Sequence, residues 1–202
     1  MAQSEPDTQE LDWIRRAQRG EHDAFGRLVE RYRKQVFGLV YHLVRNANDV
    51  EDLAQEIFIK IFKGIGGYNF QSPFRSWVSR VAVNHCYDYL RRIRSSRVST
   101  FAEFSEASQT LLEARPPLHR NPGDDFQQQI EVRDLALQLL GRAPEEDRGI
   151  LVMKEIEGKP VEEIAAILDL KTATVKVRLH RARKRMLEDY KRMKQGRKGH
   201  AM

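Results

Sequence analysis

The sequence contains a single cysteine, Cys86, among its 202 residues. One cysteine excludes an intramolecular disulfide and a zinc site built from several thiolates. The chain does not open with a signal-peptide pattern, and its longest strongly apolar run, residues 36–44, is about half as long as a membrane-spanning helix. We therefore expect a cytoplasmic protein that is not inserted in a membrane and binds no metal.

Groups that could perform catalysis are equally scarce. The six histidines are scattered without acidic partners at ligand spacing, and no glycine-rich phosphate loop occurs. His85 and Cys86 are neighbours in a predicted helix, where their side chains point about 100° apart and cannot form a hydrogen-bonded dyad. The sequence predicts a protein that is not an enzyme, with no catalytic residue and no cofactor.

Positive charge is in excess, and it is unevenly placed. Lys and Arg number 35 against 29 Asp and Glu. Residues 171–198 hold twelve basic side chains against two acids, and residues 75–97 hold six against one. Residues 48–56 hold four acids and no basic residue, and a second acidic segment, residues 99–133, separates the basic blocks. This distribution favours an anionic partner, either nucleic acid or a membrane surface.

Apolar residues recur at helical spacing along most of the chain, and no alternating strand pattern is present. We predict an all-α fold with two small helical domains, residues 10–95 and 130–192. A flexible linker over residues 96–129 joins them, because the pattern there gives way to Ser, Thr, Glu and Pro. A disordered N-terminus (1–9) and a basic tail (193–202) complete the predicted organisation.

A loop rich in aromatic residues precedes a helix that begins at Ser72 and Pro73, typical of an N-cap followed by proline, and ends near Ile93. Aromatic side chains beside arginines suit unpaired bases, because any base can stack on a ring. A role in the core is the alternative, and we favour it for Trp77. The predicted base-contacting residues are Tyr68, Asn69, Phe70, Gln71, Arg80, Asn84 and Arg91.

Residues 161–185 predict a helix-turn-helix, in which a short helix, a tight turn and a long basic helix follow one another. At about 100° per residue, Val175, Leu179 and Ala182 share one side of the second helix, so the opposite side faces outward. The predicted DNA-contacting residues are Thr174, Lys176, Val177, His180, Arg181 and Lys184. The alternative is a solvated basic helix that closes a helical bundle.

An acidic face is predicted on the helix over about residues 49–62. Asp52, Gln55 and Glu56 lie at positions i, i+3 and i+4 and therefore share one side of the helix. Such a face is either simply solvated or a docking surface for a basic partner.

Three of these segments resemble bacterial σ factors. Residues 51–58 (EDLAQEIF) resemble the core-binding helix, region 2.2, and residues 74–84 resemble regions 2.3 to 2.4, which bind the −10 element. Residues 162–183 resemble region 4.2, which binds the −35 element. The likeness spans about residues 10–192 in the family's order. The short linker with nothing else resembles the extracytoplasmic-function (ECF) type, group 4 of the sigma-70 family.

The resemblance implies a σ factor that binds the β and β′ subunits of RNA polymerase core, recognises −10 and −35 promoter DNA and helps melt the −10 region. It assigns core binding to Asp52, Gln55 and Glu56, and it implies control by an anti-σ factor. Two rivals remain open. One is a helix-turn-helix regulator that binds duplex operator DNA without polymerase. The other is a nucleotide-modifying or metal enzyme, for which the sequence offers no ligand or acid–base cluster.

The chain departs from the family pattern in the helix-turn-helix. Lys171 and Ala173 stand where the family usually has Pro and Gly, and Val177 stands where Ser is frequent. These departures predict a −35 preference related to the family's consensus but altered at one position.

Overall fold

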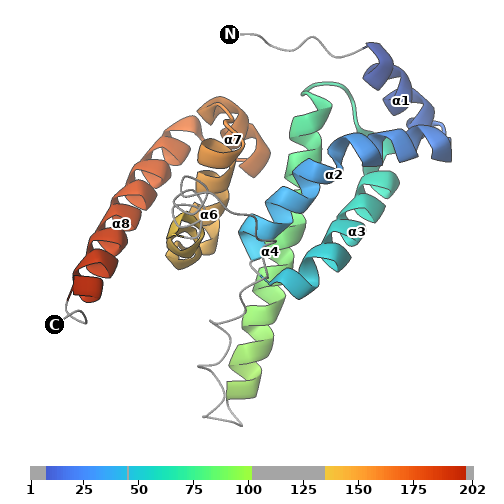
Figure 1. Ribbon diagram of the computed structural model, residues 1–202. Coiled ribbons are helices and arrows are strands. Elements are labelled where there is room, and N and C mark those ends of the chain that lie inside the picture. The colour runs from blue at the N-terminus through green and yellow to red at the C-terminus, as the bar shows by residue number, and fades with distance from the viewer. Residues whose placement is uncertain (1–7, 45, 102–134, 199–202) are drawn as a thin grey trace, which may run out of the picture. The chain divides into compact units, whose positions relative to one another are not determined.

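A computed structural model describes residues 8–44, 46–101 and 135–198 of the chain (Figure 1). All regular structure in these ranges is helical and no strand occurs among them, which confirms the predicted all-α class. The chain divides into two compact units, with the boundary between Arg92 and Ile93. Within the described ranges, no helix is long and apolar enough to span a membrane.

The first unit packs its helices on a central helix, α2, most of whose apolar stripe is buried. The elements are α1 (Thr8–Gln18), α2 (His22–Val44), α3 (Ala47–Gly64), the 3-10 turn η1 (Ile65–Gly67) and, as far as Arg92, α4 (Phe74–Phe101). Both α1 and α3 lie against α2 (Figure 1). Val36 and Val40 of α2, Ile57 of α3 and Val78 of α4 are buried, as the 3.6-residue periodicity predicts.

Helix α4 begins later and ends later than predicted. The N–H groups of Ser76 and Trp77 donate to the carbonyl of Pro73 at 2.9 and 3.2 Å. Pro73 is therefore the residue before the helix, which begins at Phe74. It continues to Phe101, through the first part of the predicted linker. No glycine or proline lies between Ile93 and Phe101, so nothing in the sequence ends the helix there.

Two other helices extend a few residues beyond the predicted domain bounds. α1 begins at Thr8, inside the segment predicted to be disordered, and α8 continues to Lys198, inside the predicted basic tail. Lys, Arg, Met and Gln dominate that tail and are good helix formers, which explains the extension. The remainder of the predicted linker (102–129) and residues 1–7, 130–134 and 199–202 lie outside the described residues.

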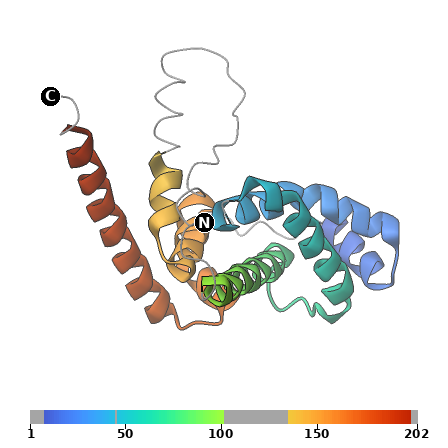
Figure 2. The ribbon, with the colours of Figure 1, turned by 90° about the horizontal axis from the view of Figure 1, so that it is seen from below.

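The second unit contains the predicted helix-turn-helix. Its elements are a helical segment at residues 135–142, α6 (Glu145–Leu151), the π-helical turn η3 (Val152–Ile156), α7 (Val161–Leu168) and α8 (Thr172–Lys198). α7 ends at Asp169, which has a left-handed φ of 54° and whose N–H donates to the carbonyl of Ala165. Aspartate tolerates this conformation better than most residues. α8 then runs as one continuous helix (Figure 2).

Two buried cations fix the helices that precede α8. Arg148 of α6 donates to the carbonyls of Leu140, Gly141 and Ala143 at 3.1–3.2 Å, which caps the end of the preceding helical segment. Lys159, only 3% exposed, precedes α7, and its Nζ lies 2.8 Å from Oε1 of Glu163. These contacts set the position of α7 and therefore of the turn into α8.

Candidate polymerase and promoter interfaces

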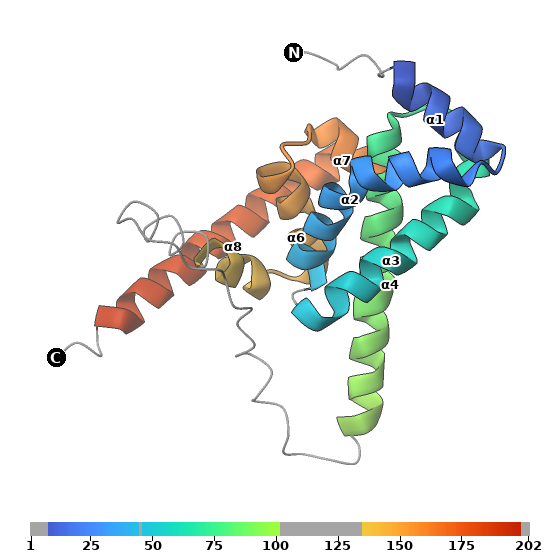
Figure 3. The same ribbon diagram turned by 45° about the vertical axis from the view of Figure 1, so that its right-hand side comes forward.

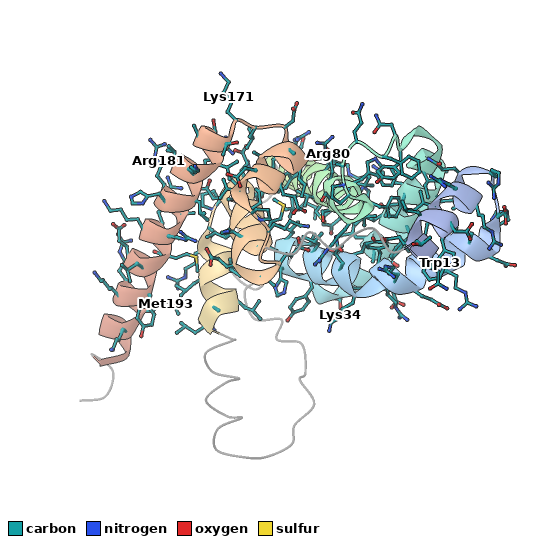
Figure 4. All side chains as sticks on the ribbon, turned by 90° about the horizontal axis from the view of Figure 1, so that it is seen from above. Trp13, Lys34, Arg80, Lys171, Arg181 and Met193 are labelled. Atoms are coloured by element: carbon teal, nitrogen blue, oxygen red, sulfur yellow. The ribbon has the colours of Figure 1, made fainter. Side chains whose placement is uncertain are left out.

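The predicted −35 residues lie on the outward side of α8. Val175, Leu179 and Ala182 are buried against the rest of the unit. Thr174 is half-buried, and the exposed members of the predicted set are Lys176, Val177, His180, Arg181 and Lys184. Figure 4 shows Lys171 extending away from the turn that precedes this helix. The structure therefore brings the predicted −35 residues together on one exposed surface, which we call the α8 outer face.

Ion pairs divide the cations in the first half of α8, residues 172–185, into two sets. The first set is held by acids of α6 and η3 at 3.0 Å or less, in the pairs Arg178–Glu146, Arg183–Glu155 and Arg185–Asp147. The second set, Lys176, Arg181 and Lys184, has no acidic partner in the part of the chain that the structure describes. The unit thus neutralises three of these cations itself and leaves those of the α8 outer face for an external anion.

The loop between η1 and α4 is built around Tyr68. The Tyr68 hydroxyl donates to the carbonyl of Ser72 at 2.6 Å, which closes the loop. The ring lies 5.1 Å from that of Phe74 and 5.6 Å from that of Trp77, and the residue is only 6% exposed. The interpretation of Tyr68 as a base contact is therefore corrected, because its ring is buried among other aromatics and offers no free face.

Phe70, two residues later, has the opposite environment. It is 42% exposed, and its φ of 61° is a left-handed conformation that residues other than glycine rarely adopt. Asn69 and Gln71 are exposed as well, and the Asn69 side-chain oxygen accepts the N–H of Gln71 at 3.2 Å, which stabilises the turn. Strained conformations of this kind cluster at ligand-binding segments. Phe70 is thus the ring of this loop that a base could reach.

The α4 residues predicted to contact DNA share one exposed side of the helix. Arg80, Asn84 and Arg91 are all exposed, and their spacing places them within about 40° of one another around the helix axis. Arg91 also lies 3.4 Å from Asp88 in an ion pair. Trp77 is half-buried and stacks on Phe74 with ring centroids 5.4 Å apart, in agreement with the predicted core role.

The predicted core-binding face on α3 is exposed, but one member is already engaged. Asp52 and Gln55 are exposed. The Glu56 carboxylate, although 55% exposed, lies 2.7 Å from Nε2 of buried His85 on α4. Glu56 therefore connects α3 to α4 in addition to any role at the surface.

Cys86 is buried in the first unit, and burial raises the pKa of its thiol from 9.0 to about 12. Because the thiolate is the reactive form, we expect no labelling of the native protein by a disulfide reagent at pH 8. Labelling should appear only in denaturant, and rapid labelling of the folded chain would contradict the structure. The folded-state pKa is the higher one, so this thiol's contribution to stability is complete below pH 9 and is lost as the pH rises toward 12.

Sequence reasoning missed the residues that hold these surfaces in place. Arg148 and Gln18 donate to carbonyls of other segments, and periodicity within one helix carries no signal for such contacts. Lys159 lies four residues before Glu163, so an i, i+4 charge pattern in the sequence was the signal for that pair. Among the described residues, no group of three or more His, Cys, Asp or Glu side chains could hold a metal ion.

Comparison with protein families gives two matches in the order of the two units. The model "Sigma-70 region 2" matches residues 28–96, and "Sigma-70, region 4" matches residues 133–186. The region 2 match begins after α1 and includes the loop and the α4 surface. The region 4 match includes α6, α7 and the first half of α8.

Solved structures of similar fold include CnrH in complex with the cytosolic domain of CnrY, with a TM-score of 0.64, 22% identity and coverage of 92% of this chain and 98% of that one. The sigma factor RpoE of Bartonella quintana, in complex with the anti-sigma factor NepR, has the same TM-score of 0.64 with 20% identity, over 83% of this chain and 96% of that one. At these identities, the likeness shows the fold.

Curated relatives are closer in sequence. The chain is 33% identical over 183 residues to the RNA polymerase sigma-H factor of Pseudomonas aeruginosa, over 87% of this chain and 92% of that protein. It is 35% identical over 175 residues to the ECF RNA polymerase sigma-E factor of Escherichia coli K12, over 84% and 88% of the two chains. Both matches extend through the two units described above, and the chain therefore belongs to the sigma-70 family, as a sigma factor of the ECF type, group 4.

Proposed function

We propose that this sigma factor places its two units on the two elements of one promoter, with the α8 outer face on the −35 duplex and the loop around Phe70 on an unpaired −10 base. The observation that carries the proposal is the sorting of cations on α8, which leaves Lys176, Arg181 and Lys184 without acidic partners in the described chain. A regulator that binds only duplex DNA through its helix-turn-helix does not need an exposed, strained aromatic loop in its other unit.

The −10 contact requires both stacking and reading of a base edge. Unstacking a base costs a few kcal/mol, which the site must return. The exposed ring of Phe70 supplies a stacking surface, and base–aromatic stacking is worth about 1–3 kcal/mol. The Asn84 side chain has both an amide donor and a carbonyl acceptor, so it can read a base edge. Arg80 and Arg91 lie on the same side of α4 as Asn84, and their charges suit the phosphates of the bound strand.

The regulatory and cellular parts of the proposal rest on the relatives. The Bartonella quintana sigma factor was solved with an anti-sigma factor, and we extend this kind of control to the present chain. Sigma factors act on RNA polymerase as initiation factors rather than as enzymes. We accordingly assign this chain to the cytoplasm, with no catalytic activity of its own.

Run-off transcription with purified core polymerase and this protein alone tests the proposal. Genomic fragments should give discrete transcripts that depend on the protein, whereas core alone should give none. If the free protein instead binds a duplex operator as a dimer and yields no transcript with core, the chain acts as an ordinary helix-turn-helix regulator.

The acidic face of α3 gives a second expected result. Asp52→Lys should weaken core binding at least tenfold, because a reversed charge turns attraction for a basic docking surface into repulsion. Glu56→Lys is a poorer variant, since it would also break the contact with buried His85. Affinity is measured by competition with a labelled sigma factor for core. Glu30→Lys, an equal charge change on an exposed acid of α2, is the control. Equal affinity of the Asp52 and Glu30 variants would remove α3 from the interface.

A further inference from the structure

Helix α1 is joined to the base-receiving loop by two hydrogen bonds from its last residue, Gln18. The Gln18 side-chain amide donates to the carbonyl of Ile65 at 3.0 Å and to the carbonyl of Tyr68 at 2.8 Å. These two carbonyls mark the two ends of the η1 turn, which leads into the loop. Both amide protons of Gln18 are thus used on the backbone of a segment that lies about 50 residues away along the chain.

A second α1 side chain lies against the exposed ring of the loop. The guanidinium carbon of Arg15 is 6.0 Å from the centroid of Phe70, at the limit of a cation–π contact. The Tyr68 ring also lies 4.8 Å from that of Phe70. Figures 1 and 3 show α1 beside the segment that leads into α4. Phe70 is thus positioned by α1 as well as by its own loop.

The opposite end of α1 is itself fixed. Glu10 is buried, hydrogen-bonds the Tyr32 hydroxyl and lies 3.4 Å from Nε of Arg31 on α2. The start of α1 is therefore held by α2 and its end is hydrogen-bonded to the loop, so α1 connects α2 with the loop. The region 2 match begins at residue 28, so α1 lies outside it.

We propose that Gln18 is a positioning residue for promoter opening, and that it acts by holding Phe70 in the left-handed conformation that receives an unpaired base. The inference rests on the proposed −10 contact. A loop fixed before binding does not lose conformational freedom when the base arrives, and so retains more of the stacking energy. Without the two Gln18 hydrogen bonds, Phe70 would relax from its φ of 61° to more populated conformations.

A purely structural role for Gln18 predicts a different pattern of effects. If Gln18 only stabilised the first unit, its loss would weaken core binding and DNA binding together. It would also add to the effect of losing the Phe70 ring. Positioning through Phe70 instead predicts that the two changes are not additive.

The experiment uses holoenzyme assembled from core polymerase and full-length protein. The probe is a single-stranded dodecamer from the non-template strand of a promoter that the wild type transcribes, with 2-aminopurine at each −10 position in turn. The variants are Gln18→Leu, Phe70→Ala and the double variant. Asp12→Asn, an exposed α1 residue whose ion pair with Arg16 does not reach the loop, is the control. Core affinity and thermal unfolding followed by tryptophan fluorescence are measured for each.

We expect Gln18→Leu to weaken strand binding about 5- to 10-fold and to abolish the fluorescence change at one −10 position, with core affinity within twofold of wild type. The double variant should match Phe70→Ala. Additive losses, or a parallel loss of core affinity, would overturn the inference while leaving the proposed function intact. A wild type that binds core but no −10 strand would overturn the −10 contact, and this inference with it.

Discussion

Lys159→Met is expected to lower the free energy of unfolding of the second unit by about 3 kcal/mol. The Lys159 side chain is 3% exposed, and its ammonium group lies 2.8 Å from Glu163 and 3.7 Å from Glu157, so its removal takes away a cation that both carboxylates face. The value is at the low end for breaking a buried pair, because Glu163 keeps 26% exposure and some hydration. Since Lys159 precedes α7, the same change should weaken −35 binding by displacing the turn.

The two units can be followed separately in this experiment. Both tryptophans, Trp13 and Trp77, lie in the first unit, so tryptophan fluorescence reports only that unit, whereas circular dichroism reports the helices of both. The dichroism transition should begin at lower temperature, and the fluorescence transition should stay in place. Lys171→Met, the same change at an exposed position, is the matched control. Equal melting of the two variants would contradict the assigned pair.

The −35 contact should be sensitive to two changes on the α8 outer face that differ in kind. Arg181→Ala is expected to cost about 1–3 kcal/mol and relax one base position if Arg181 reads a guanine edge. If it holds a phosphate, all sequences weaken equally. Val177→Ser should change the selected sequence at one position, because valine offers only apolar contact, for example to a thymine methyl group.

The measurement is a selection of −35 elements from a randomised promoter library. It is carried out with wild-type, Arg181→Ala and Val177→Ser holoenzymes. Arg183→Ala is the control, since that residue is paired with Glu155 and is not a member of the predicted −35 set. An unchanged selected sequence for Val177→Ser would show that Val177 does not contact a base and that this departure from the family pattern is only structural.

The helices could be predicted because burial repeats along them with a regular period. The stripes of α2 and α3 and the buried side of α8 all follow from residue spacing. The ends of the helices were less accurate, since α4 continues where no glycine or proline stops it, and α8 continues past Gly196 to Lys198. A change from apolar to polar composition at Arg94 therefore marked the edge of the core rather than the end of the helix.

The aromatic loop shows where sequence reasoning fails for a physical reason. Tyr68 and Phe70 are of similar size, and a loop has no period that assigns one to the core and the other to solvent. The choice is made by the Tyr68 hydroxyl, which reaches the Ser72 carbonyl, and by Gln18, which reaches the loop from another helix. Contacts of this kind join residues far apart in the chain, as does Glu56 with His85, and no local pattern encodes them.

The ion pairs behind α8 have a consequence for the way in which DNA binding responds to salt. Each phosphate neutralised by a protein cation releases counterions and contributes about −0.9 to the slope of log K against log salt concentration. Arg178, Arg183 and Arg185 already have carboxylates as counterions, so a phosphate that engages them gains little net release. The α8 outer face offers Lys176, Arg181 and Lys184, which limits its contribution to a slope of about −3, although residues 171–198 carry twelve basic side chains. The α8 outer face is therefore less salt-sensitive in binding than the composition of residues 171–198 suggests, so its contact with the −35 element persists at ionic strengths that would release a helix with all of the cations of residues 172–185 unpaired.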